Sequence, residues 1–186
     1  MSNLGILAIV LGVGLGASQF YGLKNPARYA AAARKFSRSL RWGYGLMLLG
    51  TAWFLYYLSQ ESISDFAAYK NWLIAGFAAV GLGSCVFVQD FLSVRGLAVV
   101  LLLLAKMMVD TGRPYLQQTG WVLVIQGWAY VFVVAGIWLT ISPWRLRDWL
   151  EWATANEKRL KLVCSIGLGF GLVVAGLEMA VLRGPA

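Results

Sequence analysis

Six apolar segments constrain the fold of this chain more than any other feature of its sequence. They cover about residues 4–21, 42–58, 71–89, 91–109, 121–141 and 162–182. A helix needs about 20 apolar residues to cross a bilayer, because each residue adds about 1.5 Å to its length. The chain is 60% hydrophobic, well above the roughly 45–50% of a soluble domain. The sequence therefore predicts an all-α integral membrane protein, with residues 1–186 forming one transmembrane domain of six transmembrane helices arranged as three hairpins.

Two further segments are amphipathic rather than apolar, and they cover about residues 26–41 and 144–161. At helical spacing the first puts its apolar residues on one face and its five basic residues on the other. The basic residues that we assign to the lipid interface in these two segments are Arg28, Arg34, Lys35, Arg38, Arg41, Arg145 and Arg147. Asn25-Pro26 and Ser142-Pro143 have the form of an N-cap followed by proline at the first helical position. We expect two interfacial helices whose basic side chains meet anionic lipid headgroups.

The basic residues also indicate how the chain is oriented. With six spans, the connections between the first and second, third and fourth, and fifth and sixth spans share one side, and they hold twelve basic residues against four opposite. Basic residues accumulate on the cytoplasmic side of inner-membrane proteins. The sequence therefore predicts an inner (plasma) membrane protein with both interfacial helices on the cytoplasmic side and both termini outside the cytoplasm. The net charge of +8 is explained in this way without nucleic acid.

The composition argues against most cofactor chemistry carried by this chain alone. It has no histidine, the usual ligand in helical haem and catalytic zinc sites. Cys85 and Cys164 lie inside apolar segments without a CxxC pattern, and we interpret them as small buried residues. No metal motif or nucleotide loop occurs. We expect no cofactor and no catalytic residue.

One group of polar residues is predicted near the outer face. It comprises Lys106, Asp110, Arg113, Gln126 and Glu178. Lys106 and Asp110 are i, i+4 and share a helix face, and Glu178 is placed to neutralise Lys106 from the last span. The group is consistent with a polar vestibule or ion site. The interpretation that we favour is charges at helix ends that extend toward the headgroups, together with one structural pair.

Glycine pairs four residues apart occur in the first and last spans, at Gly12 and Gly16 and at Gly167 and Gly171. This spacing lets another helix approach closely. The first functional hypothesis is a non-catalytic membrane subunit or scaffold that packs in a larger complex or a homo-oligomer. The alternative is a small transporter or channel using Lys106, Asp110 and Glu178, and an intramembrane enzyme is a third hypothesis.

The turns SPWRLRDWLEW and NPARYAAAARKF, each between apolar helices, resemble those of short bacterial inner-membrane hairpin proteins with a Pro–basic turn. The resemblance covers about a third of the chain. It implies an inner-membrane location and no particular activity. A weak repeat of span, polar cap, basic residue and span also runs through the three predicted hairpins, with Asn25-Pro26, Gln89-Asp90 and Ser142-Pro143 as the cap and turn residues. It is consistent with a triplicated ancestor, or simply with the needs of any membrane hairpin.

Overall fold

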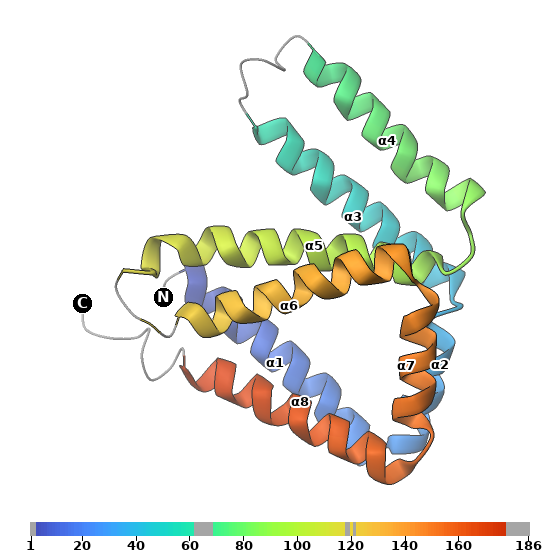
Figure 1. The fold of residues 1–186 in the computed structure, drawn as a ribbon, viewed down its shortest axis with the longest axis vertical. Helices are drawn as coiled ribbons and strands as arrows, with labels where there is room; N and C mark the ends of the chain where they lie inside the picture. Colours follow the sequence, from blue (N-terminus) through green and yellow to red (C-terminus); the bar gives the residue numbers. More distant parts are fainter. Residues whose placement is uncertain (1–2, 62–68, 118–119, 121, 178–186) are drawn as a thin grey trace. The chain divides into compact units, whose positions relative to one another are not determined.

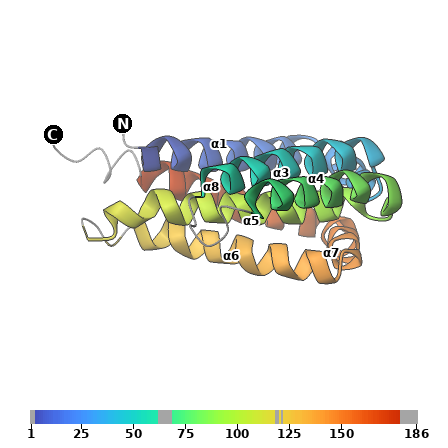
Figure 2. The same ribbon diagram turned by 90° about the horizontal axis from the view of Figure 1, so that it is seen from above.

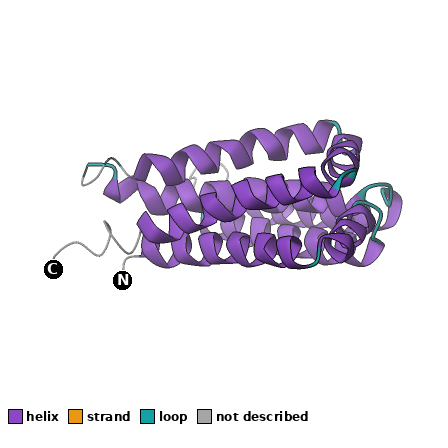
Figure 3. Ribbon diagram, turned by 90° about the horizontal axis from the view of Figure 1, so that it is seen from below, coloured by secondary structure: helices purple, strands orange, loops and turns teal. Residues whose placement is uncertain are grey.

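The computed structural model describes residues 3–61, 69–117, 120 and 122–177, and all the regular structure in these ranges is helical (Figures 1 and 3). Eight α-helices and one short 3₁₀-helix occur there. They are α1 (Asn3–Lys24), α2 (Pro26–Phe36), α3 (Leu40–Gln60), α4 (Lys70–Phe87), α5 (Leu92–Gly112), η2 (Arg113–Tyr115), α6 (Val122–Ile141), α7 (Trp144–Thr154) and α8 (Glu157–Leu177). The all-α prediction is confirmed.

Five of these helical segments are long and apolar enough to cross a membrane: Gly5–Lys24, Lys70–Phe87, Leu92–Tyr115, Val122–Ile141 and Glu157–Gly176. Helix α3, the predicted second span, is not among them. It has 21 residues, but five are Trp or Tyr and three are Gly, which contribute little to hydropathy. The chain thus has several helices that fit a membrane protein, whereas the sixth span and the three-hairpin arrangement stay predictions.

The two amphipathic segments form helices that end earlier than predicted. Helix α2 ends at Phe36, and a turn at 37–39 separates it from α3. Serine favours such a turn because its hydroxyl competes for backbone hydrogen bonds. Helix α7 ends at Thr154, and Asn156 then begins α8 by accepting a hydrogen bond from the Lys158 amide at 3.1 Å.

The chain divides into two compact units. Unit 1 contains Met1–Arg34, Leu104–Phe132 and Asp148–Ala186, and unit 2 contains Lys35–Leu103 and Val133–Arg147. Helices α5 and α6 therefore contribute to both units.

In unit 1, α1 lies beside α8 (Figures 1 and 2). A Cβ added at Gly12 would lie 2.8 Å from the Gly171 carbonyl oxygen, and one added at Gly171 would lie 2.7 Å from the Gly12 carbonyl oxygen. The Gly167 position is covered by the Gln19 side chain, and the Gly16 position faces Leu168. The glycine pairs predicted for helix packing thus serve contacts within the chain.

In unit 2, α3 packs against both α4 and α5. Thr51 of α3 covers Gly81 of α4, and the rings of Phe54 and Phe77 meet with centroids 4.9 Å apart. On the α5 side, a Cβ at Gly96 would lie 2.8 Å from the Met47 amide nitrogen. Helices α3 and α4 run side by side (Figure 1).

Hydrogen bonds also join the end of α3 to the first residue of α4. Lys70 Nζ donates to the carbonyl oxygens of Ser59 at 2.5 Å and Glu61 at 2.9 Å. The start of α4 therefore lies at the end of α3, and the two helices form an antiparallel pair.

Candidate functional site

A cavity of about 550 Å³ lies in unit 2, where three connections of the chain meet. The first is the turn between α2 and α3, the second is the turn between α4 and α5, and the third is the start of α7. Its lining residues are Ser37, Arg38, Ser39, Leu40, Gln89, Asp90, Phe91, Leu92, Ser93 and Arg147. The volume is within the range of about 300–1,000 Å³ typical of small-molecule sites.

The turn between α2 and α3 is closed by backbone hydrogen bonds. The Ser39 amide donates to the Phe36 carbonyl at 3.1 Å, and the Ser39 carbonyl accepts from the Gly43 amide at 2.9 Å. Ser39 is extended at the N-cap of α3, but its hydroxyl makes no capping bond. The Ser39 hydroxyl is therefore not used to cap α3.

The turn between α4 and α5 is held in an unusual backbone conformation. Phe91 has φ of 55°, a left-handed value that bulky residues rarely adopt. In this conformation its carbonyl accepts hydrogen bonds from the amides of Val94 at 2.9 Å and Arg95 at 3.0 Å, which begins α5. The conformation also directs the chain so that Phe91, Leu92 and Ser93 all line the cavity.

One buried hydrogen bond joins the two turns. Ser93, which is 1% exposed, donates from Oγ to the Phe36 carbonyl at 2.8 Å. Gln89 Nε2 donates to the Tyr44 hydroxyl at 3.4 Å, a second link between the turn and α3. The walls of the cavity are thus connected by specific polar contacts.

The charge of the cavity favours an anion. Two guanidinium groups, Arg38 and Arg147, line it together with the single carboxylate of Asp90. The first turn of α5 carries no acidic residue, so the positive end of its dipole is not neutralised from within the helix. Leu40, Phe91 and Leu92 add an apolar part to the lining.

The structure brings together two of the seven basic residues assigned to the lipid interface, Arg38 and Arg147. The exposed side chains of Arg28, Lys35, Arg41 and Arg145 are not part of the cavity lining.

Arg34, the seventh of these residues, donates two hydrogen bonds to Thr154 of α7. Its Nε donates to Thr154 Oγ1 at 2.7 Å and its Nη2 to the Thr154 carbonyl at 2.6 Å. Within unit 1 these two hydrogen bonds join the two amphipathic helices.

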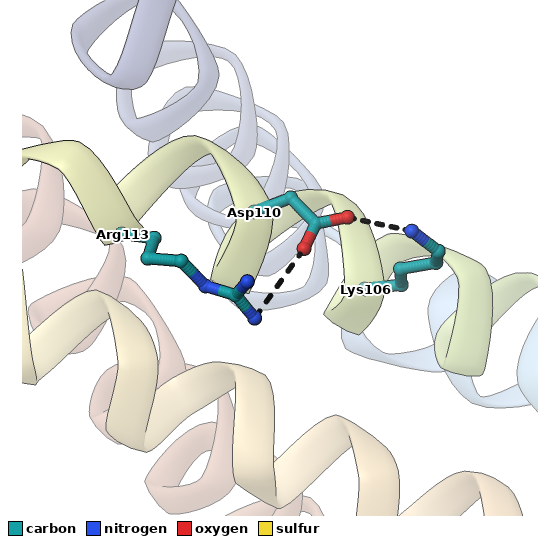
Figure 4. A network of polar contacts seen from close by, with 3 residues as sticks. All are labelled: Lys106, Asp110 and Arg113. Atoms are coloured by element: carbon teal, nitrogen blue, oxygen red, sulfur yellow. Dashed lines mark hydrogen bonds and ion pairs between the residues drawn. The ribbon is translucent and has the colours of Figure 1, made fainter.

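The predicted outer polar cluster forms in part along one helix (Figure 4). Lys106 Nζ lies 2.7 Å from Asp110 Oδ2, and Arg113 Nη2 lies 3.9 Å from Asp110 Oδ1. The Lys106 and Asp110 side chains are each 44% exposed. Gln126 of α6 lies beside Gly112, and Glu178 is outside the described residues.

The position of the half-buried Tyr29 in unit 1 was not predicted from the sequence. Tyr29 of α2 lies where Gly22 of α1 and Cys164 of α8 come together, since a Cβ at Gly22 would meet Cys164 Sγ at 2.8 Å and the Tyr29 ring at 3.3 Å. Burial raises the pKa of Tyr29, the effect of Cys164 adds to this, and a hydrogen bond with Gln19 acts in the opposite direction. The Tyr29 ring thus lies where α2 meets α1 and α8.

Sequence reasoning missed most of the cavity. Gln89 and Asp90 were predicted to be cap and turn residues, and Ser37, Ser39 and Ser93 carried no assigned role. One signal in the sequence could have indicated the cavity. The three basic connections are predicted to lie on the same side, and residues of all three line the cavity.

A second candidate surface lies on α4. Ala75, Ala79 and Gly83 follow one another at four-residue intervals on the side opposite to Gly81 and Cys85, which are buried. A Cβ at Gly76 would meet nothing within 4 Å, and Trp72 on the same side is 79% exposed. Only 11% of the 18-residue apolar segment of α4 is buried, the lowest share among the five candidate spans.

Within the described ranges, no group of three or more His, Cys, Asp or Glu residues is placed to hold a metal ion. The chain matches no protein-family model, no curated protein and no solved structure, so its function has to be inferred from these two surfaces.

Proposed function

We propose that this chain is a non-catalytic integral membrane subunit that associates through the small-residue face of α4 with a second transmembrane helix. The face comprises Ala75, Gly76, Ala79 and Gly83. The observation that carries the proposal is that Ala75, Gly76 and Ala79 on this face are exposed while the opposite face of the same helix is packed on α3.

The contrast between the glycines of α4 favours a helix as the occupant of this face. Gly81 is filled by Thr51, whereas Gly76 has open space at its Cβ position. A glycine inside a helix lowers its stability by about 0.5–1 kcal/mol relative to alanine, and lipid offers no compensating contact. Small residues four apart let two helix backbones approach, which is how transmembrane helices associate without a hydrophobic driving force.

The first expected occupant is a second copy of this chain. The motif from Ala75 to Gly83 is self-complementary across a two-fold axis, and two-fold dimers are the commonest oligomers. A different membrane protein bearing a small-residue face is the other occupant that the surface would accept.

Cross-linking tests this proposal. Cys85 and Cys164, both buried, are replaced by Ala, and Ala79→Cys is introduced at the middle of the face. Bismaleimide treatment of membranes should give a product of twice the chain mass, or a larger product whose second component mass spectrometry identifies. The matched control is Val131→Cys on α6, an exposed mid-helix position that is 61% accessible.

A bulky variant provides the second measurement. Ala79→Leu should lower the cross-linked fraction of a Gly83→Cys protein severalfold while leaving the melting temperature unchanged, because Ala79 is exposed in the single chain. If Ala79→Cys reacts no better than Val131→Cys and Ala79→Leu has no effect, the face does not associate with a helix.

The arrangement of unit 2 supports the six-span topology that belongs to this proposal. Helix α3 lies antiparallel to the candidate span α4 and is joined to it from Gly81 to Lys70. We expect a helix beside α4 to cross the same layer even though its Trp and Tyr residues lower its hydropathy. The cavity also gathers residues from the three connections expected on the cytoplasmic side of an inner membrane.

The alternative of a small transporter or channel has no comparable support. Lys106 and Asp110 are ion-paired within α5 and equally exposed, as expected for charges near the end of a span. Glu178, the third residue of that hypothesis, lies outside the described residues.

A further inference from the structure

We propose that the cavity between the α2–α3 turn, the α4–α5 turn and the start of α7 binds the phosphate group of an anionic phospholipid headgroup. This site goes beyond the subunit role, and it shares no residue with the α4 face. Its assignment rests on charge, on the donors that line the cavity, and on its mixed polar and apolar lining.

The cavity combines donors suited to phosphate. Arg38 and Arg147 provide planar guanidinium groups, which bind phosphate oxygens in pairs with high geometric specificity. The Ser39 hydroxyl makes no capping bond and provides a further donor. Asp90 is the only carboxylate in the lining, so the charge of the lining remains positive.

The backbone reinforces this preference. Phe91, in its left-handed conformation, begins α5 at the wall of the cavity. The dipole of a 21-residue helix therefore ends there with its positive end. An anion in the cavity gains from this field in addition to the two arginines.

The apolar part of the lining distinguishes a lipid from a soluble phosphoester. Leu40, Phe91 and Leu92 stand beside the arginines, and Leu40 and Leu92 begin the two long helices α3 and α5. A phospholipid presents the same sequence of groups, with a phosphate followed by glycerol and the first acyl carbons. A free phosphate ion would leave these apolar side chains uncovered.

The test uses the full purified chain in phosphatidylcholine nanodiscs, with short-chain phosphatidylglycerol as the probe and native mass spectrometry as the readout. Arg38→Gln and Arg147→Gln should each weaken binding about tenfold or more, as expected when a hydrogen bond to a charged group is lost. The matched controls are Arg41→Gln and Arg145→Gln, exposed arginines close to these in the sequence that do not line the cavity. They should change binding by no more than about twofold, because their side chains lie outside the cavity lining.

Two further variants sharpen the result. Asp90→Asn should strengthen phosphatidylglycerol binding, because it removes the only negative charge of the lining. Ala79→Leu should leave it unchanged, which separates this site from the proposed α4 association. Melting temperatures of all variants establish that they are folded.

Three results would overturn the assignment. Equal losses in the Arg41→Gln and Arg145→Gln proteins would show diffuse attraction to the basic surface. Weaker binding by Asp90→Asn would show that the cavity does not select an anion. Affinity for glycerol phosphate equal to that for short-chain phosphatidylglycerol would assign the cavity to a soluble phosphoester instead of a lipid.

Discussion

Single glycines in this chain have opposite roles according to what stands beside them. Gly12 and Gly171 each face the backbone of the other helix, so that an added Cβ would lie under 3.0 Å from a carbonyl oxygen. Gly14 and Gly169, two residues away on the same helices, would meet nothing within 4 Å. Helical periodicity explains the difference, since a shift of two residues turns a side chain to the other side of the helix.

This difference predicts opposite signs for the same substitution. Gly12→Ala or Gly171→Ala should destabilise the chain by about 1–3 kcal/mol, because α1 and α8 must move apart. Gly14→Ala and Gly169→Ala should be neutral or stabilise by up to about 1 kcal/mol through helix propensity. Thermal unfolding of the four variants in one detergent measures both effects. Equal shifts for all four would show that α1 and α8 are not in close contact.

At the level of the elements, the two amphipathic helices α2 and α7 are joined to each other by side-chain hydrogen bonds. Arg34 of α2 donates two hydrogen bonds to Thr154, the last residue of α7, and Thr154 is buried. Thr154 in turn donates to the Leu150 carbonyl at 2.6 Å. The arginine therefore satisfies a carbonyl that would otherwise lack a partner at the helix end.

The two hydrogen bonds from the Arg34 guanidinium group to Thr154 predict that lysine cannot replace Arg34. Arg34→Lys retains the charge but offers a single ammonium group, so we expect a loss of about 1–2 kcal/mol and faster amide exchange in the last turn of α7. Arg28→Lys, at an exposed position of the same helix, is the matched control and should change neither quantity. Unchanged exchange in Arg34→Lys would mean that charge alone holds the two helices.

The sequence predicted the elements well because their signals are local. Apolar runs, proline at Pro26 and basic faces each lie within one helix, and the structure has helices at these places. The ends of α2 and α7 were predicted too late, because apolar periodicity continues past Phe36 and Thr154 while the serines at 37 and 39 and Asn156 stop the helices.

The cavity could not be predicted in the same way. Each of its three connections is visible in the sequence, but their meeting depends on helix lengths and packing. The left-handed conformation of Phe91 had no sequence signal at all, since glycine or asparagine is the usual residue there. The glycines predicted for helix packing lie against another helix of the same chain, a pairing that their spacing alone does not indicate.

For the molecule as a whole, the proposed six-span topology makes a direct prediction about accessibility. In a protein with Cys85 and Cys164 replaced by Ala, single cysteines at the exposed positions Glu61 and Gln117 should react with an impermeant maleimide on intact spheroplasts. Cysteines at Arg41 and Lys158, also exposed, should react only after lysis. Labelling of Arg41→Cys and Glu61→Cys from the same side would show that α3 does not cross the membrane.

The pairing of α1 with α8 has a consequence for how the chain is made. Residues 25–156 separate the two helices, so α1 leaves the ribosome long before its partner exists. In the proposed membrane topology, the glycine face of α1 would stay uncovered in the bilayer until α8 is inserted. A chain truncated before α8 would lack the surface that covers Gly12 of α1.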